Sequence, residues 1–135
     1  MTGLERNIYE EMASRMESLS ELSEQKPGND FEYQALSLRK SMDEAAIKSL
    51  RMIMEYSDTA ENIDMAYTFG AIRRYAEAYD ISLRDAIRYI DSHNMNVEEI
   101  EGSILEQNSE MFFDEDGCYD RQKLQDYIVS MERSA

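Results

Sequence analysis

The stretch from Phe31 to Tyr56 limits the possible folds of this chain more than any other. Read at 3.6 residues per turn, one apolar stripe contains Phe31, Ala35, Leu38, Met42, Ala45, Ala46, Ile53 and Tyr56. A second stripe beside it contains Leu36, Ile47, Leu50 and Met54. Because two adjoining apolar stripes need cover from two directions, the pattern predicts a central helix. One neighbour should precede this helix in the chain, and a group of short helices should follow it.

A second helical pattern lies before the central helix. It predicts a helix over residues 3–25, with apolar positions at Leu4, Ile8, Met12, Met16, Leu19 and Leu22. Pro27 and Gly28 end this pattern, because proline cannot continue a helix and glycine favours a reversal. Asn29 or Asp30 can cap the next helix. The sequence therefore predicts an antiparallel helical hairpin over residues 1–57.

Shorter helices are predicted after the hairpin. One should run from about residue 60 to 79, with its cap among residues 57–59. Ser82 and Asn96 stand at the starts of two further apolar patterns, and Asp120 stands before a last one. Asp116-Gly117 is a strong turn signal between apolar residues, so one small β-hairpin near residues 111–119 is allowed.

The length and the scarcity of helix breakers support this layout. A chain of 135 residues is within the usual size of one domain, and it contains only one Pro and five Gly. We expect a single all-α domain over residues 1–135. It should be a helical bundle with an N-terminal hairpin (1–57) and a C-terminal part of several short helices (58–135).

The net charge of −15 excludes several kinds of partner. Phosphate backbones and anionic membrane surfaces would repel this chain, so we expect no direct nucleic-acid or membrane binding. No run of about 18 apolar residues suits a membrane span, and the first residues lack the apolar core of an export signal. With Cys118 as its single cysteine, the chain is expected to be cytoplasmic.

Most of the negative charge lies in one stretch. Residues 94–120 contain nine Asp and Glu residues and no Lys or Arg, which gives a net charge of −9. Carboxylates that repel one another lower the stability of the fold unless an outside cation relieves them. One interpretation is a solvated face that only improves solubility. The other is a docking surface for a basic partner.

Aromatic residues beside these charges favour the docking interpretation, since aromatics supply buried anchors and charges steer association. The predicted partner-binding residues are Glu98, Glu99, Glu101, Glu106, Glu110, Phe112, Phe113, Asp114, Glu115, Asp116 and Tyr119. The leading hypothesis is a small acidic module that occupies a basic surface on another protein. Such a nucleic-acid mimic could inhibit a nucleic-acid-binding partner, as an anti-defence inhibitor or an antitoxin would.

Two other classes of function compete with this hypothesis. An adaptor protein would extend the apolar stripe of the hairpin, including Leu4 to Leu22, to a second copy and form a four-helix homodimer. An enzyme is not expected, because no set of base, nucleophile and orienting group emerges. A deep pocket lined by Tyr67, Tyr75, Tyr79 and a carboxylate with a perturbed pKa would revive that possibility.

Metal, cofactor and nucleophile chemistry also find little support, and we predict no cofactor. Alignment of Gly117 with the glycine of a calcium loop puts Phe112 and Lys123 at ligand positions, so only a non-standard site at Asp114, Asp116 and Asp120 remains. One histidine cannot serve a di-metal or zinc site. The acids around Cys118 would suppress its thiolate.

The basic residues that stand closest together are Arg73, Arg74, Arg84 and Arg88. They are expected to pair with nearby acids such as Asp80, Asp85 and Asp91.

Overall fold

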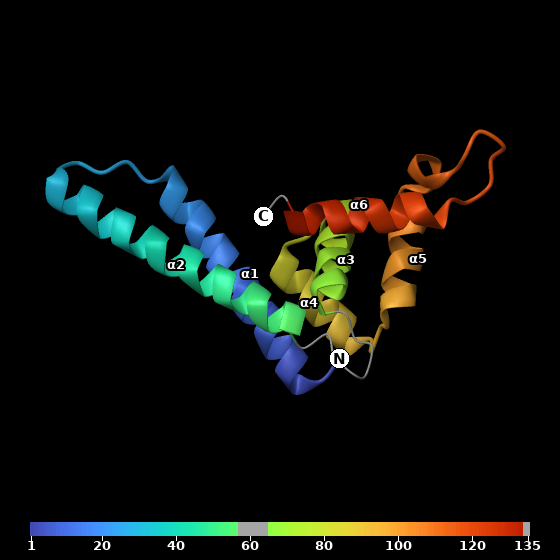
Figure 1. Cartoon of the computed structure of the whole chain (residues 1–135), viewed down its shortest axis with the longest axis horizontal. Helices are drawn as coiled ribbons and strands as arrows, with labels where there is room; N and C mark the ends of the chain where they lie inside the picture. Colours follow the sequence, from blue (N-terminus) through green and yellow to red (C-terminus); the bar gives the residue numbers. More distant parts are fainter. Residues whose placement is uncertain (57–64, 134–135) are drawn as a thin grey trace.

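The computed structural model describes residues 1–56 and 65–133, with side chains up to residue 130. In these ranges the chain forms six α-helices, one short 3-10 helix and no β-strand (Figure 1). The elements are α1 (Gly3–Glu24), α2 (Asp30–Tyr56), α3 (Met65–Ala78), α4 (Leu83–Ser92), α5 (Val97–Gln107), η1 (Ser109–Phe112) and α6 (Arg121–Arg133). The predicted all-α fold is confirmed. The expected cap at residues 57–59 and the start of the third helix lie outside the described residues.

Side-chain caps set the starts of the C-terminal helices as predicted. The Ser82 hydroxyl accepts a hydrogen bond from the backbone N–H of Asp85 at 3.1 Å. The Asn96 side chain accepts one from the N–H of Glu99 at 2.8 Å. The Asp120 carboxylate caps α6 in the same way. Each cap satisfies a backbone donor that has no partner inside its helix, so these short helices begin at defined residues.

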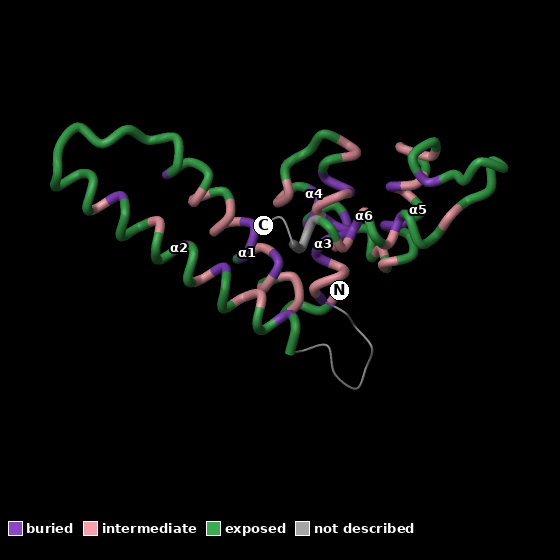
Figure 2. Tube along the Cα trace, turned by 45° about the horizontal axis from the view of Figure 1, so that its top comes forward, coloured by how far each residue is buried: buried purple, intermediate pink, exposed green. Residues whose placement is uncertain are grey.

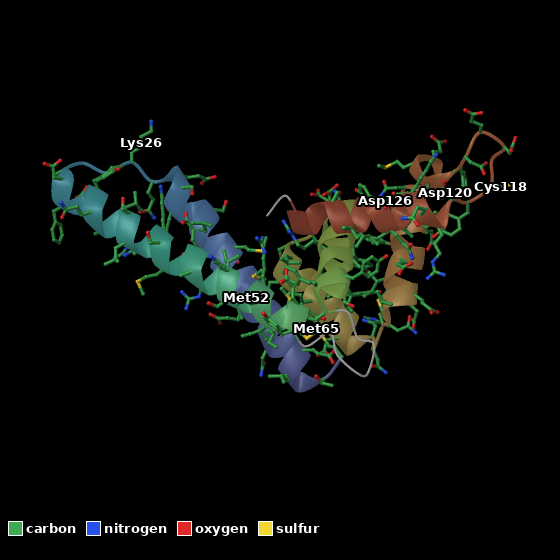
Figure 3. The ribbon with its side chains drawn as sticks, in the orientation of Figure 1. Lys26, Met52, Met65, Cys118, Asp120 and Asp126 are labelled. Atoms are coloured by element: carbon green, nitrogen blue, oxygen red, sulfur yellow. The ribbon has the colours of Figure 1, made fainter. Side chains whose placement is uncertain are left out.

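Helices α1 and α2 form the predicted antiparallel hairpin, which extends from the rest of the molecule (Figure 1). Asn29 caps α2 by accepting a hydrogen bond from the N–H of Glu32 at 2.8 Å. Figure 3 shows Lys26 at the tip of the hairpin and Cys118 at the opposite end of the molecule. The hairpin is anchored at its base, where α1 packs on α4 and the end of α2 approaches α3.

The core lies where the base of the hairpin meets α3–α6, as the buried segments in Figure 2 indicate. Tyr9 of α1 stacks on Phe69 of α3, with ring centroids 5.7 Å apart. The fully buried side chains also come from α4, α5, η1 and α6 and include Met12, Ile72, Ile87, Ile90, Ile100, Ile104, Phe112, Leu124 and Ile128. Every described helix except α2 contributes a side chain of this kind, which ties the C-terminal helices into one core.

The prediction that α2 is covered on two sides is wrong for the described residues. Leu36, Ile47 and Met54 of its second stripe are buried, and this side of α2 faces α1. Phe31, Leu38, Met42, Ile53 and Tyr56 of its first stripe are exposed. Helical periodicity shows that a face is apolar, but it does not show which other element covers that face.

The stripe on α1 behaves in the opposite way and is largely used within the chain. Met12 and Leu22 are buried, and Ile8, Met16 and Leu19 are partly buried against the core. Leu4 alone among the predicted positions of this stripe is an exposed large side chain. The larger uncovered apolar surface of the hairpin is therefore on α2 rather than on α1.

The arginines of α3 and α4 find partners other than those predicted. Arg84 lies 3.8 Å from Glu17 of α1, and Arg88 lies 3.8 Å from Glu10. Asp91, one of the expected partners, instead accepts a 2.7 Å hydrogen bond from Arg6. These long-range pairs hold α1 against α4, which the local sequence spacing could not reveal.

Arg74 connects α3 to α6. Its Nε donates to the backbone oxygen of Tyr127 at 2.9 Å, and its guanidinium lies 3.6 Å from the centroid of the Tyr127 ring. The hydroxyl of Tyr127 in turn donates to Glu77 at 2.9 Å. A planar guanidinium can stack on a ring and donate at its edge together, so Arg74 is a structural residue here.

Within the described residues, no helix has both the length and the apolarity needed to span a bilayer.

A candidate docking surface at the acidic end

The exposed acidic residues of α5 lie on one side of that helix. At 100° per residue, Glu98, Glu99 and Glu106 fall within an arc of about 100°, and all three are exposed. Ile100 and Ile104 on the other side are buried in the core. The alternation of acidic and apolar positions in α5 therefore orients three predicted site residues toward solvent.

Glu101 does not belong to this exposed group, although it was predicted to bind the partner. It is buried, and one of its carboxylate oxygens accepts a 3.4 Å hydrogen bond from the hydroxyl of Tyr67. Burial and the charge of Glu101 raise the pKa of Tyr67 above its ordinary value. Glu101 thus joins α5 to α3 and is not available to a docking partner.

The remaining exposed acids lie in η1 and in the turn between η1 and α6. Asp114 accepts hydrogen bonds at 2.9 Å from the backbone N–H groups of Asp116 and Cys118, and Gly117 has a φ of +79°. One antiparallel bridge joins Phe113 to Tyr119, so the expected β-hairpin is reduced to a single bridge. The turn keeps Asp114, Glu115 and Asp116 exposed, and Glu110 of η1 is exposed beside them.

Two glycines near this surface should respond oppositely to substitution by alanine. Gly117→Ala should destabilise the protein by about 1 kcal/mol, because its left-handed φ disfavours a Cβ. Gly102→Ala should stabilise it by roughly 0.5–1 kcal/mol, since Gly102 lies inside α5 and a Cβ there meets open space. Urea unfolding followed by circular dichroism would measure both changes. Shifts of equal sign would contradict the structure.

The two adjacent phenylalanines lie in different environments. Phe112 is 1% exposed and packs edge-on against Tyr127 at a centroid distance of 5.4 Å, so it cannot be a docking anchor as predicted. Phe113 is 39% exposed, and Tyr119 across the bridge is also exposed. The aromatic surface next to the acids therefore consists of Phe113 and Tyr119.

The exposed carboxylates of this region lack ion-pair partners among the side chains that the structure describes. The ion pairs of the described side chains all use carboxylates of α1, α2, α3 and α4, namely Glu10, Glu11, Glu17, Asp43, Glu77 and Asp91. Arg121 and Lys123 are the first two basic residues that follow the turn in the sequence. The ammonium group of Lys123 donates to the backbone oxygen of Phe113 at 3.2 Å. The charge of Arg121 acts on Tyr119 at the edge of this region, but no carboxylate of the region forms an ion pair with a described side chain.

We define the acidic end as the exposed residues Glu98, Glu99, Glu106, Glu110, Phe113, Asp114, Glu115, Asp116 and Tyr119. Figure 1 shows that α5 and the turn after η1 lie at the end of the molecule away from the hairpin tip. Of the eleven predicted site residues, the fold brings these nine to its surface and withdraws Glu101 and Phe112 into its interior.

The acidic turn is not arranged as a metal site. Asp114 is occupied by backbone N–H groups, and Asp120 caps α6. In the described part of the chain, no three Asp, Glu, His or Cys residues are grouped closely enough to hold an ion. Cys118 is exposed in the turn, and the ring Nδ1–H of His93 donates to the backbone oxygen of Tyr89 at 2.9 Å.

Two of the three tyrosines that could have lined a catalytic pocket, Tyr75 and Tyr79, pack on each other, whereas Tyr67 donates to Glu101. Tyr75 is buried, and its ring centroid lies 4.6 Å from that of Tyr79 and 6.2 Å from that of Tyr89. A groove of about 640 Å³ occurs elsewhere, between α1 and α2, and is lined by residues that include Met16, Leu19, Ile47 and Met52. Its position on the hairpin separates it from the acidic end.

Comparison of the chain with protein-family models, with curated proteins and with solved structures gives no match.

Proposed function

We propose that this protein is a binding module whose acidic end docks onto a basic surface of another protein. The observation that carries the proposal is a group of exposed carboxylates without an ion-pair partner among the described side chains. A solubilising face would not need half-exposed aromatics in its midst, whereas a docking surface uses them as anchors. Phe113 and Tyr119 supply such anchors here.

Binding would proceed in two physical stages. Long-range attraction between the acidic end and a cationic surface accelerates encounter, and this attraction weakens as salt shortens the screening length to about 8 Å at physiological ionic strength. Burial of Phe113 and Tyr119 against the partner then slows dissociation. The proposed partner is a nucleic-acid-binding protein, because its basic surface already accommodates a dense row of negative charges. Occupation of that surface would inhibit nucleic-acid binding.

Charge reversal tests this proposal. The double variant Glu98→Lys with Glu106→Lys should weaken binding to a captured basic partner at least about tenfold, because two attractions become repulsions. Both positions are exposed on α5, so the fold should be retained. Capture from lysate at low and moderate salt would identify the partner, and calorimetry with the purified partner would measure the affinity.

A matched control separates docking from a general charge effect. Glu21→Lys with Glu24→Lys changes the net charge equally, but both positions are exposed on the hairpin, far from the acidic end. This control should bind nearly as well as the unmodified protein. Equal losses in both variants, or no loss in the α5 variant, would refute docking through the acidic end. Failure of excess duplex DNA to displace the protein would refute the nucleic-acid-binding class of partner.

A further inference from the structure

The exposed side of α2 contains a seam with the spacing of a coiled coil. Steps of four and three residues alternate without interruption through Phe31, Ala35, Leu38, Met42, Ala45, Ser49, Met52 and Tyr56. Phe31 is 79% exposed, Leu38 63% and Tyr56 74%. Packing against α1 explains one apolar stripe on α2, but it does not explain a second apolar stripe of this length that is exposed to water.

Within the described residues, α1 does not cover this seam. The buried contacts of α2 with the rest of the chain involve Leu36, Asp43, Ile47 and Met54. At 100° per residue, these positions lie roughly 150° around the helix from the seam. Most of the seam is therefore on the far side of α2 from α1. Met52 also borders the groove between the two helices, but it is 47% exposed, so the seam can meet another helix without a change in the hairpin.

The exposed area is large enough to matter. Six exposed large side chains lie on or beside the seam, namely Phe31, Leu38, Met42, Met52, Ile53 and Tyr56. With roughly 150–250 Å² for each large side chain, their exposed fractions correspond to an apolar surface on the order of 600 Å². This reaches the upper limit of the largest patch on an ordinary monomer, about 600 Å², and approaches the roughly 800 Å² per partner of a standard interface.

We propose that the occupant of this seam is α2 of a second copy of the chain, in antiparallel orientation. A two-fold axis near the middle of α2 makes the interface the same on both copies. The register that uses the whole helix places Phe31 opposite Tyr56, Ala35 opposite Met52, Leu38 opposite Ser49 and Met42 opposite Ala45 of the other copy.

The sizes of the side chains favour this orientation over the parallel one. In the antiparallel register each of Leu38, Met42 and Met52 meets a small residue, and the aromatic residues meet at the two ends. A parallel pair would place every residue opposite itself, so the layers of Ala35 and Ser49 would leave gaps. Antiparallel layers are therefore more uniform in volume.

The charges favour it as well. Residues 30–57 contain five acids and four bases, a net of −1, so this face can approach its own copy without strong repulsion. In the positions that flank the seam, the antiparallel register places Glu32 opposite Ile53 of the other copy, Arg39 opposite Ala46, Gln34 opposite Glu55 and Ser41 opposite Lys48. No pair of like charges results.

The distribution of charge over the whole chain also favours antiparallel over parallel pairing. Residues 58–135 contain 18 acids and 7 bases, a net of −11. Antiparallel pairing of a helix about 40 Å long keeps the two C-terminal parts at opposite ends, several screening lengths apart. Parallel pairing would bring them together.

Sedimentation velocity over a range of concentrations tests the dimer. The molar mass derived for the unmodified protein should be twice the chain mass of 15.8 kDa. Leu38→Glu should raise the dimer dissociation constant at least about 30-fold, because two leucines are lost and two charges enter the seam. Leu4→Glu is the matched control, since Leu4 is 71% exposed but lies on α1, and it should remain dimeric. A monomeric unmodified protein, or a dimer insensitive to Leu38→Glu, would overturn the proposal.

Disulfide cross-linking tests the orientation, in a background with Cys118→Ser because Cys118 is exposed. A mixture of Leu38→Cys and Ser49→Cys chains should form the mixed disulfide, since the two positions face each other in the antiparallel register. Leu38→Cys alone should give little cross-link, because the two copies of position 38 are then about 16 Å apart along the helices. Efficient Leu38→Cys self-linkage with no mixed product would establish the parallel pair instead.

Discussion

Phe112→Ala should destabilise the protein by about 3–5 kcal/mol, the largest single effect that the structure predicts. Phe112 is fully buried, and its ring packs against Tyr127 of α6. Its removal would leave a cavity where η1, α5 and α6 meet, and the surrounding side chains could fill this cavity only partly. Thermal and urea unfolding followed by circular dichroism would measure the loss.

The neighbouring residue provides a stringent control. Phe113→Ala should cost at most about 1 kcal/mol, because its side chain is partly in water and its bridge to Tyr119 is made by the backbone. The same substitution should weaken binding to the basic partner that we propose for the acidic end. Similar stability losses for the two variants would mean that the turn is packed differently from the structure described here.

Asp43→Ala is expected to have the second largest effect, a destabilisation of about 2 kcal/mol. Asp43 is buried between the helices of the hairpin, where it accepts a hydrogen bond from the Ser18 hydroxyl at 2.6 Å and one from Arg15 at 3.1 Å. Arg15 is more than a third exposed and also contacts Glu11, so its share of the loss is reduced by solvent screening. Most of the effect comes from the lost bond to Ser18.

The same residue predicts how the stability of the hairpin depends on pH. The Ser18 hydrogen bond and the Arg15 charge lower the pKa of Asp43 below its ordinary value. A lowered pKa in the folded state means that the contribution of Asp43 is complete above the unfolded-state pKa of about 3.9. The contribution is then lost as the pH falls through the folded-state pKa.

Unfolding of the unmodified protein and of Asp43→Asn between pH 7 and pH 3 would measure this contribution. The difference in stability should be constant above about pH 5 and should shrink in more acidic solution. Glu44→Ala, a change at the adjacent exposed carboxylate, should stay within about 0.5 kcal/mol of the unmodified protein. A difference that grows toward low pH would show that the pKa of Asp43 is raised rather than lowered.

Local features of the sequence were reliable guides to the secondary structure. The caps at Ser82, Asn96 and Asp120 and the break at Pro27 were read correctly, because each depends on residues only two or three positions apart. The two stripes of α2 were also recognised as apolar. Their environments were not predictable, because coverage depends on residues far away in the chain.

The candidate site shows the same division. Nine acids and no base within residues 94–120 marked the region, and the helical period of α5 explains why Glu98 and Glu106 point outward. Glu101 and Phe112 could not be separated from their neighbours by residue type. Glu101 turns inward because it lies on the side of α5 that faces α3, and Phe112 because η1 directs it toward α6.

By itself the sequence determined that this chain is helical, where most of the described helices begin and where its negative charge collects. Those properties follow from nearest neighbours, from capping chemistry and from charge counts. Only the tertiary structure decided which carboxylates remain in water and which apolar stripe stays uncovered. Burial is a relation between segments distant in the chain, and no local pattern contains that information.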